Sequence, residues 1–473
     1  MTMFPTSRRI RSRGAAISGF SGHIGSSAPT RVAPSPTPGC SRVKTPAFPR
    51  YSQTTKAERI DLLRQIVSVY EKRFDDMAMA ITTEMGSPLW FAKQVQADTA
   101  LAHFNQLIAV LKDYDFGHML GSTRVVREAI GVCGFITPWN WPVNQIASKL
   151  APALAAGCTV VTKPSEFSPL SAIILTEVLH EAGVPKGVFN LINGDGPTVG
   201  EAISSHPDID MVSFTGSTRA GIAVAKAAAD TVKRVHQELG GKSANVILPS
   251  ADLETAVSAG VLRSFTNSGQ SCQAPTRMLV HEDQTDRAIS IAKRTADGVT
   301  VGDPLAEGTR LGPLVSKIQF DRVQNLLETG IKEGATLVAA GPGRPAGLNR
   351  GYYVRPTVFA HVTPDMTIAQ QEIFGPALSM ISYKDEDHAV EIANGTIYGL
   401  AGYVFGGTVE EARRVGSRLR AGRVYLNGAP HGKLQDVEAP FGGYKQSGNG
   451  REAGIYGLED FLEIKALIGY QAA

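Results

Sequence analysis

REAIGVCGFITPWNWP (127–142) is followed by ASKLAPALAAG (147–157) and CTVVTKPSE (158–166), and these three segments decide the fold class. The β-branched and apolar residues of the first segment predict a strand that runs into a turn rich in proline and tryptophan. The second predicts a helix that ends at Gly157, because glycine commonly follows the last turn of a helix. The third predicts a buried strand. This order predicts two parallel strands joined by a right-handed crossover.

The alternation of strands and helices continues on both sides of these segments. Helix, strand, strand and helix are predicted in turn at LSAIILTEVLHEAG (170–183), GVFNLING (187–194), MVSFTGS (211–217) and TRAGIAVAKAAA (218–229). Residues 244–425 repeat the alternation, whereas residues 52–112 have the apolar spacing of amphipathic helices. We interpret VKRVHQ (232–237) as helix-like. We therefore expect an α/β protein with two doubly wound α/β domains.

Composition favours a soluble enzyme over a protein that binds nucleic acid or a membrane. The 473 residues are 43% hydrophobic, which is ordinary for globular proteins, and suffice for two or three domains. No uncharged apolar run approaches the ~18 residues of a membrane span. Residues 1–50 contain eight basic and no acidic residues, so the remaining chain has a small excess of acidic residues. A mildly acidic body argues against a nucleic-acid or anionic membrane partner.

The four cysteines are too few and too scattered for a disulfide framework or a zinc site. Cys40, Cys133, Cys158 and Cys272 form no CxxC or CxxH pair. We therefore expect no metal and a reducing compartment, which for this chain is the cytoplasm.

Residues 1–46 differ from the rest of the chain. They are rich in Ser, Arg, Pro and Gly and have no helical or strand period. The composition is typical of a disordered tail. An organellar transit peptide is an alternative, since such peptides are rich in Arg and Ser and poor in acidic residues. A shifted reading frame or a misplaced start in the gene sequence is a third.

Three residues have the chemistry of an active site, and each has a structural alternative. Cys272 in GQSCQ (269–273) is either a buried structural cysteine, as free cysteines commonly are, or a nucleophile. Glu238 in ELGGKS (238–243) is either a solvated or helix-capping residue or a general base that activates water. Asn140 in PWNWP is either part of a packed turn or an amide directed at a developing oxyanion.

These motifs occur together with others in a fixed order. The set is PWNWP (138–142), KPSE (163–166), FTGS (214–217), ELGGKS, GQSC, QEIFGP (371–376) and PFGGYKQSGNGRE (440–452). With this set the chain resembles the aldehyde dehydrogenase family over about residues 47–470. Within the family it is similar to a bacterial subgroup that includes 3-succinoylsemialdehyde-pyridine dehydrogenase. The resemblance implies oxidation of an aldehyde to a carboxylic acid with NAD or NADP.

The resemblance also implies the catalytic roles. Cys272 attacks the aldehyde to give a thiohemiacetal, and the Asn140 amide and the Cys272 N–H hold its oxyanion. Hydride transfer to the cofactor then leaves a thioester, which water activated by Glu238 hydrolyses. Lys149 and Glu452 match a proton-relay pair of the family, with a structural ion pair as the alternative.

The implied cofactor site spans most of the first α/β unit. Its residues are Ile136, Thr137, Pro138, Trp139, Lys163, Ser165, Glu166, Gly196, Gly200, Phe214, Thr215, Gly216, Ser217, Leu239, Gly240, Glu372 and Phe374. Glu166 accepts a hydrogen bond from a ribose 2′-hydroxyl and repels a 2′-phosphate, which favours NAD. Lys163 and Ser165 can meet a 2′-phosphate, so NADP stays an alternative.

The resemblance further implies an aldehyde tunnel bordered by Trp141, Phe265 and the segment 431–438 with His431, suited to an aromatic or medium-chain aldehyde. It also implies a Rossmann-like cofactor domain at 47–112 and 130–240 and a catalytic domain at 241–446. A small β element at 113–129 and 456–473 would pair subunits into a homodimer or homotetramer. The family's initial strands and IGG-type hairpin have no counterpart in residues 1–46.

Two alternative functions would require the loss of particular residues from these motifs. A relative that transfers the acyl group to coenzyme A would lack the base at position 238, so the presence of Glu238 argues against it. A crystallin-like structural protein would lack the nucleophile or the oxyanion amide, whereas Cys272 and Asn140 are both present.

Overall fold

The structure is a computed structural model that describes residues 47–429 and 437–471. Strand β3 (Val132–Ile136) pairs in parallel with β4 (Thr159–Lys163), and helix α6 (Pro142–Ala156) connects them. Gly157 ends α6 with a φ of 95°, a left-handed conformation that glycine adopts without strain. The predicted crossover unit is confirmed. The helix begins at Pro142 instead of residue 147, because proline fits the first helical position.

β3 and β4 belong to a six-stranded sheet. Its order is β15 (Gly448–Asn449), β7 (Arg234–Glu238), β6 (Met211–Thr215), β3, β4 and β5 (Phe189–Leu191). All neighbours are parallel except β15 and β7. Helices α7 (Leu170–Glu181), α8 (Glu201–Ser205) and α9 (Thr218–Ala228) lie between its strands in sequence.

The helical interpretation of VKRVHQ is wrong, because these residues form most of β7. Strand β7 pairs with β6 over its whole length, with Met211 opposite Arg234 and Thr215 opposite Glu238. On its other side it pairs with β15. Pairing with segments distant in sequence thus overrides a local pattern that fitted a helix. As a consequence, Glu238 ends a buried strand instead of following a helix.

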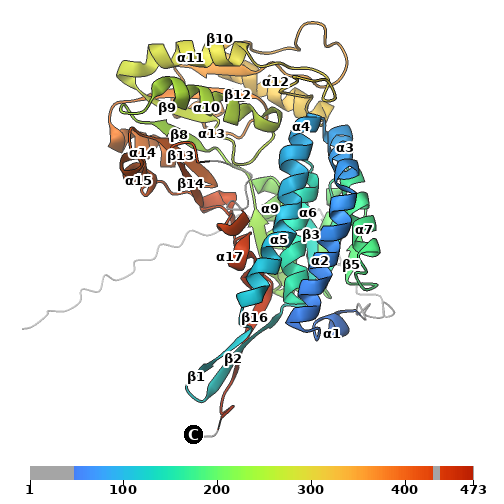
Figure 1. Cartoon of the computed structure of the whole chain (residues 1–473). Helices are drawn as coiled ribbons and strands as arrows, with labels where there is room; N and C mark the ends of the chain where they lie inside the picture. The colour runs from blue at the N-terminus through green and yellow to red at the C-terminus, as the bar shows by residue number, and fades with distance from the viewer. Residues whose placement is uncertain (1–46, 430–436, 472–473) are drawn as a thin grey trace, which may run out of the picture. The chain divides into compact units, whose positions relative to one another are not determined.

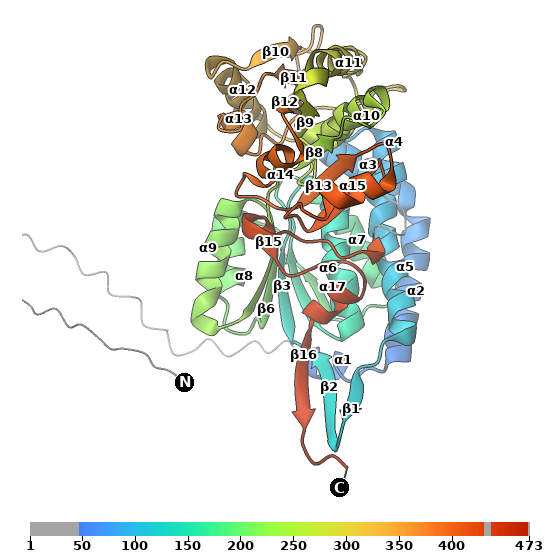
Figure 2. The same cartoon turned by 90° about the vertical axis from the view of Figure 1, so that its left-hand side faces the viewer.

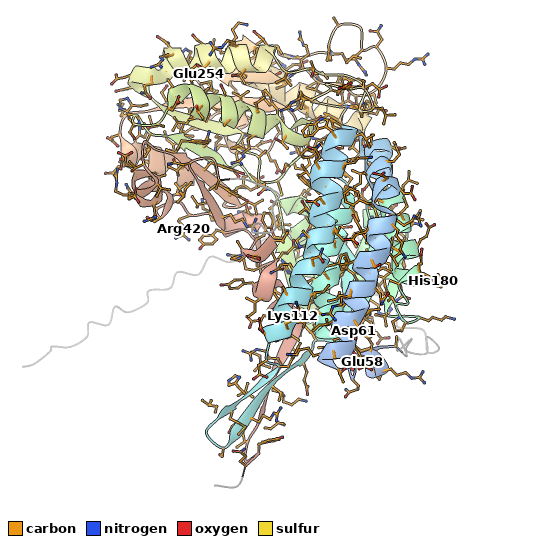
Figure 3. All side chains as sticks on the ribbon, viewed as in Figure 1. Glu58, Asp61, Lys112, His180, Glu254 and Arg420 are labelled. Atoms are coloured by element: carbon orange, nitrogen blue, oxygen red, sulfur yellow. The ribbon has the colours of Figure 1, made fainter. Side chains whose placement is uncertain are left out.

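Helices near the N-terminus cover one face of this sheet. They are α1 (Phe48–Tyr51), α2 (Lys56–Lys72), α3 (Phe74–Met85), α4 (Leu89–Phe91), the π-helix η1 (Ala92–Ala97) and α5 (Asp98–Asp113). Figure 1 shows α2 and α5 running beside α6, and residues of all three share one hydrophobic core. A Thr55–Glu58 capping box begins α2, a cap worth about 1 kcal/mol. Figure 3 shows Glu58 and Asp61 on the outer face of α2, opposite buried Leu63 and Ile66.

A second, seven-stranded sheet follows in the sequence. Its order is β10 (Thr336–Ala339), β11 (Thr357–Ala360), β12 (Ala377–Tyr383), β9 (Arg277–His281), β8 (Ala244–Ile247), β13 (Ala401–Phe405) and β14 (Arg423–Leu426). Only β10 and β11 are antiparallel. The helices between these strands are α10 (Leu253–Phe265), α11 (Thr285–Asp297), α12 (Lys317–Lys332), α13 (Thr367–Gln370), α14 (Glu386–Asn394) and α15 (Val409–Gly416).

Both faces of this sheet are covered, because successive strand residues belong to different cores. Val246 packs in one core with residues of α12, α14 and α15, whereas Ile247 packs in another with residues of α10 and α11. Side chains of a strand alternate between the two faces, so helices lie on both. The doubly wound α/β architecture predicted for residues 244–425 is therefore confirmed (Figure 2).

A three-stranded antiparallel sheet has the order β1 (Gly117–Leu120), β2 (Thr123–Ala129) and β16 (Leu462–Leu467), with α17 (Gly454–Asp460) just before β16. The C-terminal segment thus forms an edge strand, as predicted. Ile464 of β16 is 69% exposed and Ile468 beyond it 87%. Among the described residues, no helix is long and apolar enough to cross a membrane. Predictions for residues 1–46 lie outside the described residues.

Candidate active site

Cys272 follows a tight turn at the end of α10. Asn267, Ser268 and Gly269 have φ values of 57°, 56° and 73°, so three consecutive residues are left-handed. A Cβ on Gly269 would lie 2.1 Å from the backbone of Gly375, so only glycine fits there. The turn is held from outside, since the Ser268 hydroxyl donates to the Gly312 carbonyl at 2.9 Å. The left-handed turn and its buried hydrogen bond to Gly312 therefore fix the backbone that presents Cys272.

Asn140 lies next to this turn, although it is far away in sequence. Its amide donates to the Gln270 carbonyl at 3.1 Å, and the Asn267 amide donates to the Asn140 carbonyl at 2.9 Å. Asn140 is 3% exposed. These reciprocal bonds tie the loop after β3 to the loop that carries Cys272. A side-chain amide has a second N–H, which stays free for another acceptor in this geometry.

The ELGGKS segment passes directly behind Cys272. A Cβ on Gly241 would lie 2.2 Å from the Cys272 carbonyl oxygen, so the two backbones touch. The Ser447 hydroxyl donates to the Gly240 carbonyl at 2.7 Å and accepts from the Gly399 N–H at 2.9 Å. The Gly-Gly pair that looks flexible in the sequence is thus fixed in place. The pair connects Glu238, the last residue of β7, to the backbone that contacts Cys272.

Glu238 is a buried carboxyl whose pKa lies near neutral pH. It is 2% exposed, and burial raises its pKa to about 7, with the neighbouring Glu452 carboxylate acting in the same direction. His236 and Lys149 act in the opposite direction. A carboxyl with such a pKa accepts and releases protons at neutral pH, which suits a general base.

Cys272 does not become a thiolate through its surroundings alone. Burial of the thiol and the nearby carboxylates of Glu372 and Glu238 raise its pKa above the usual range. Nearby backbone N–H groups of Cys272 and Gln273 partly offset this. Attack by this thiol therefore needs a base to take its proton.

Lys149 and Glu452 form a buried ion pair. The Lys149 ammonium also donates to the Thr215 hydroxyl at 2.7 Å, which joins α6 to the end of β6. Burial disfavours the Glu452 carboxylate, but the charges of Lys149 and His236 outweigh it and lower its pKa. The predicted pair is thus in contact, and its electrostatic influence reaches Glu238.

Two cavities meet at Cys272. One, of about 650 Å³, has walls from both α/β units: Pro138, Trp139, Asn140, Thr215, Gly216, Ser217, Leu239, Gly240, Cys272, Gln319, Arg322, Glu372 and Phe374. The other, of about 730 Å³, is lined by Val95, Thr99, His103, Trp141, Asn144, Gln145, Ser148, Ser271, Cys272, Gln273, Arg423, Val437, Phe441, Glu452 and Ala453. The thiol can thus meet one molecule from each side.

Nine of the residues predicted to hold the cofactor line the first cavity, as does Asn140. Trp139 and Phe374 contact each other edge to face across it, with ring centroids 5.4 Å apart. The Glu372 carboxylate accepts from the Gly241 N–H at 3.0 Å. The remaining predicted residues lie along the same sheet at or after the ends of its strands, namely Ile136, Thr137, Lys163, Ser165, Glu166, Gly196, Gly200 and Phe214.

Two residues of the first cavity were missed from the sequence. The Gln319 amide donates to the Phe374 carbonyl at 2.7 Å, and the Arg322 guanidinium donates to the Glu372 carbonyl at 2.8 Å. Both lie on the first turns of α12, where the sequence shows only an ordinary amphipathic helix. Nothing local distinguishes them from solvated residues.

The second cavity supports only one of the three predicted substrate residues. Trp141 lines it and packs edge to face against Phe91, with centroids 5.5 Å apart. Phe265 does not line it. Its side chain is 1% exposed and packs in the core beside α10 and α11, because the left-handed turn that follows separates it from Cys272. His431 lies outside the described residues. Arg423, Phe441 and His103 were missed, since they come from three distant segments.

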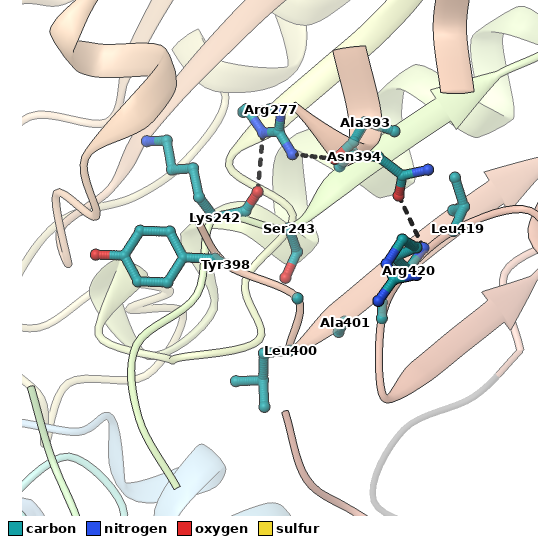
Figure 4. Close-up of a pocket in the computed structure, with 14 residues that line it drawn as sticks. Lys242, Ser243, Arg277, Ala393, Asn394, Tyr398, Leu400, Ala401, Leu419 and Arg420 are labelled. Carbon is teal, nitrogen blue, oxygen red and sulfur yellow. Dashed lines mark hydrogen bonds between the residues drawn. The ribbon is translucent and has the colours of Figure 1, made fainter. Parts of the chain in front are cut away.

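A third cavity, of about 290 Å³, is lined by Lys242 and Ser243, which follow the Gly-Gly pair in the sequence (Figure 4). The buried Arg277 guanidinium donates to the carbonyls of Lys242, Ile392 and Ala393 at 2.7–2.8 Å. At the other end of the cavity the Asn394 side chain accepts from the Arg420 N–H at 2.8 Å. Cys272 is not among its lining residues. These contacts support the loop that carries Lys242 and, through it, Glu238.

The comparisons agree with this geometry. The model of the aldehyde dehydrogenase family matches residues 42–467. The chain belongs to the aldehyde dehydrogenase family. Its reaction is therefore the oxidation of an aldehyde. The described residues contain no cluster of His, Cys, Asp and Glu that could hold a metal ion.

Individual relatives match over most of their length. The chain is 55% identical to a 3-succinoylsemialdehyde-pyridine dehydrogenase of a Pseudomonas species, covering 90% of this chain and 89% of the relative. A cysteine-to-alanine mutant of aldehyde dehydrogenase C from Pseudomonas syringae, solved with NAD⁺ and octanal, is 51% identical with a TM-score of 0.89, covering 91% of this chain and 88% of that one. Betaine aldehyde dehydrogenase of Staphylococcus aureus, solved with NAD⁺, is 36% identical with a TM-score of 0.86, covering 90% and 86%.

Proposed function

We propose that this dehydrogenase uses NAD and forms a thiohemiacetal and then a thioester on Cys272, which water activated by Glu238 hydrolyses. The observation that carries the proposal is the position of Cys272 in the walls of two cavities. One cavity is lined by nine of the residues expected to hold a dinucleotide, and the other is open to an aldehyde. Two further observations support it: Asn140 lines the first cavity together with Cys272, and the Glu238 carboxylate is near enough to raise the pKa of the thiol.

The first chemical step is attack by the Cys272 sulfur on the aldehyde carbon. A carbon–sulfur bond forms, the carbonyl oxygen becomes an oxyanion, and the thiol proton leaves to a base. The free N–H of the Asn140 amide stabilises the oxyanion, because a preorganised donor in a water-poor site lowers the energy of developing charge. Bound NAD would accept the hydride that leaves the same carbon, so that a thioester stays on the cysteine.

The second step is hydrolysis of the thioester. Glu238 takes a proton from water, the resulting hydroxide adds to the acyl carbon, and the carbon–sulfur bond breaks to release the acid and the thiolate. A pKa near 7 lets Glu238 serve as this base at neutral pH.

The residues of the first cavity fit a dinucleotide. Ser217 caps the N-terminus of the eleven-residue helix α9, where backbone N–H groups and the helix dipole favour a phosphate. Trp139 and Phe374 offer aromatic surfaces to a nicotinamide ring, and the Glu372 carboxylate offers an acceptor to ribose hydroxyls. Leu239 and Gly240 complete the wall between this cavity and Cys272.

Glu166 supports NAD over NADP. The Lys163 ammonium lies 3.2 Å from the Glu166 carboxylate and donates to the Pro164 carbonyl at 2.9 Å. Lys163 is therefore already occupied by acceptors of this chain. A 2′-phosphate would have to compete with Glu166 for it and would meet the repulsion of that carboxylate.

The substrate proposed is an uncharged aldehyde with an aromatic or medium-length apolar chain. Trp141, Phe441 and Val437 provide apolar walls in the second cavity. The related enzyme from Pseudomonas syringae was solved with octanal, an aldehyde of this kind.

We also propose the arrangement of the chain in functional parts. Residues 47–112 and 130–240 form the cofactor domain, and residues 241–446 form the catalytic domain. Residues 113–129 and 456–473 pair with a second copy of the chain, giving a dimer or a tetramer. The exposed apolar side chains of β16 and its position at a sheet edge support this pairing.

The test is a panel of aldehydes offered with NAD or NADP, with the reduced cofactor followed by its absorbance. Wild type should turn over octanal and related aldehydes, release the free acid and show no change when coenzyme A is added. Cys272→Ala should abolish turnover while NAD still binds, as measured by calorimetry. Turnover in Cys272→Ala equal to wild type would refute the proposal. An acyl-CoA product would instead indicate the coenzyme-A-acylating reaction.

A further inference from the structure

Behind Glu238 lies a row of side chains that the reaction described so far does not use. Arg234, His236 and Glu238 occupy alternate positions of β7, so their side chains point to the same face of the sheet. The end of α17 and the start of β16 lie against that face. The Arg234 guanidinium donates to the carbonyls of Asp460 at 2.6 Å and of Leu462 at 3.0 Å. This anchors the last residue of α17 beside β7.

His236 fills the space between Asp460 and Glu238. Its Nδ1 lies 2.9 Å from an Asp460 carboxylate oxygen, and its Nε2 lies 3.5 Å from a Glu238 carboxylate oxygen. The imidazole and the Glu238 side chain are each 3% exposed, whereas the Asp460 carboxylate is 27% exposed. Both ring nitrogens of one buried histidine thus face carboxylates.

The surrounding backbone is shaped for this contact. A Cβ on Gly450 would lie 3.0 Å from the His236 ring and 2.8 Å from the Asp460 carboxylate, and Gly450 has a φ of 78°. The Arg451 N–H donates to the same Asp460 oxygen at 3.0 Å. Asp460 is therefore fixed by the backbone, and only glycine at 450 leaves room for the imidazole.

The charges in this cluster favour a protonated His236. The groups that act on it are Glu238 on β7, Glu452 before α17 and Asp460 at the end of α17, and Lys149 on α6 pairs with Glu452. Burial alone would lower the pKa of His236, but the contacts with Asp460 and Glu238 outweigh it and raise the pKa to about 9. With a neutral imidazole, three carboxylates would share the single charge of Lys149. An imidazolium therefore relieves repulsion between groups that water screens poorly.

We propose that His236, held by Asp460, is a positioning residue that keeps Glu238 ionised and directed at its task as general base. The proposal rests on the proposed function of Glu238. The imidazolium places its Nδ1 2.9 Å from the Asp460 carboxylate and its Nε2 3.5 Å from the Glu238 carboxylate, so its positive charge stabilises the ionised form of Glu238 and favours one position of that side chain. Asp460 acts through His236, in the way that a buried carboxylate orients a histidine in other catalytic sites.

The kinetic test uses His236→Gln, Asp460→Asn and the control Glu459→Gln, which removes a neighbouring carboxyl of α17 that faces Tyr114 and Arg127 instead. Wild type should show a burst of reduced cofactor followed by a slower steady rate. In His236→Gln the burst should persist, whereas the acid limb of the steady rate should move up by about one pH unit, a tenfold change in the ionisation constant of Glu238. Asp460→Asn should move it in the same direction by less, and Glu459→Gln should leave it unchanged.

Histidine titration supplies a readout that does not depend on turnover. In protein labelled with ¹³C-histidine, the resonance that disappears in His236→Gln should titrate near pH 9, and in Asp460→Asn it should titrate at lower pH. An acid limb that stays in place in His236→Gln overturns the role of His236, and so does a resonance that titrates alike with and without Asp460. A merely structural role would lower the burst and the steady rate at every pH. Wild type without any turnover would instead overturn the proposed function itself.

Discussion

Gly241 and Cys272 touch through their backbones, because a Cβ on Gly241 would lie 2.2 Å from the Cys272 carbonyl oxygen. Gly241→Ala should therefore displace the loop of the nucleophile. We expect kcat to fall by about 100-fold, since a misplacement of 1 Å has that effect, and the free energy of unfolding to fall by about 1–3 kcal/mol. Steady-state kinetics and denaturant unfolding measure the two. Gly298→Ala is the control and should change neither, because a Cβ on Gly298 would make only ordinary contacts at 3.5 and 3.6 Å and its φ is −81°.

The pH dependence of the steady rate follows from the raised pKa of Glu238. Water activation needs the carboxylate, so the rate should increase with pH up to about 7, the pKa that burial produces, and level off above it. Glu238→Gln should preserve the burst of reduced cofactor. Its steady rate should fall by about 10²–10⁴-fold, the usual contribution of a general base. Stopped-flow absorbance separates the two phases. A lost burst with an unchanged steady rate would contradict this assignment.

Asn140→Ala tests the oxyanion donor. The substitution removes the donor and its bond to the Gln270 carbonyl, so the burst rate should fall by about 10²–10³-fold. NAD affinity should stay within a factor of about three, and calorimetry checks this. Asn140→Asp keeps the size but replaces the donor by a negative charge, so it should be at least as slow. A normal burst rate in both variants would exclude a role for the amide.

The sequence predicted most of the α/β order, because burial on both sheet faces leaves a plain apolar pattern between glycine and proline boundaries. It failed at residues 232–237, where pairing of β7 with β6 and β15 decides the structure and no local pattern records it. The predicted roles of Cys272, Glu238 and Asn140 came from motifs. Each motif lies at the end of a strand or in a left-handed turn. Few residue types fit such positions, so the motif can be recognised in the sequence.

Residues brought in from distant segments could not be predicted in the same way. Gln319 and Arg322 reach the cofactor cavity from α12, and Asp460 reaches His236 from α17. Phe265 is the opposite case, since the family resemblance implied a place for it in the tunnel. Three left-handed residues reverse the chain after it and leave it in the core. Three-dimensional proximity at this site is set by turns that local propensity does not reveal.

Cofactor preference should shift when Glu166 loses its charge. In Glu166→Gln the 2′-phosphate of NADP no longer meets a carboxylate, and Lys163 loses its ion-pair partner and becomes free to bind that phosphate. We expect the ratio of kcat/KM for NADP to that for NAD to rise by about tenfold, equivalent to 1.4 kcal/mol. Glu177→Gln is a suitable control, because Glu177 lies on α7, pairs with Arg73 and lines neither cavity at Cys272. An unchanged ratio would show that the preference has another origin.

Assembly should depend on the exposed edge strand β16. Ile464 is 69% exposed, and an unpaired edge with apolar side chains is a surface on which a second copy of the chain can add strands. Ile464→Lys places a charge there, so light scattering after size exclusion should show a shift from dimer or tetramer towards monomer. Ile331→Lys is the control, since Ile331 on α12 is 42% exposed but lies on no sheet edge. The Ile464→Lys protein should keep its burst of reduced cofactor, because β16 contributes no residue to either cavity at Cys272. If the Ile464→Lys protein had the same mass as wild type and the control, pairing through β16 would be refuted.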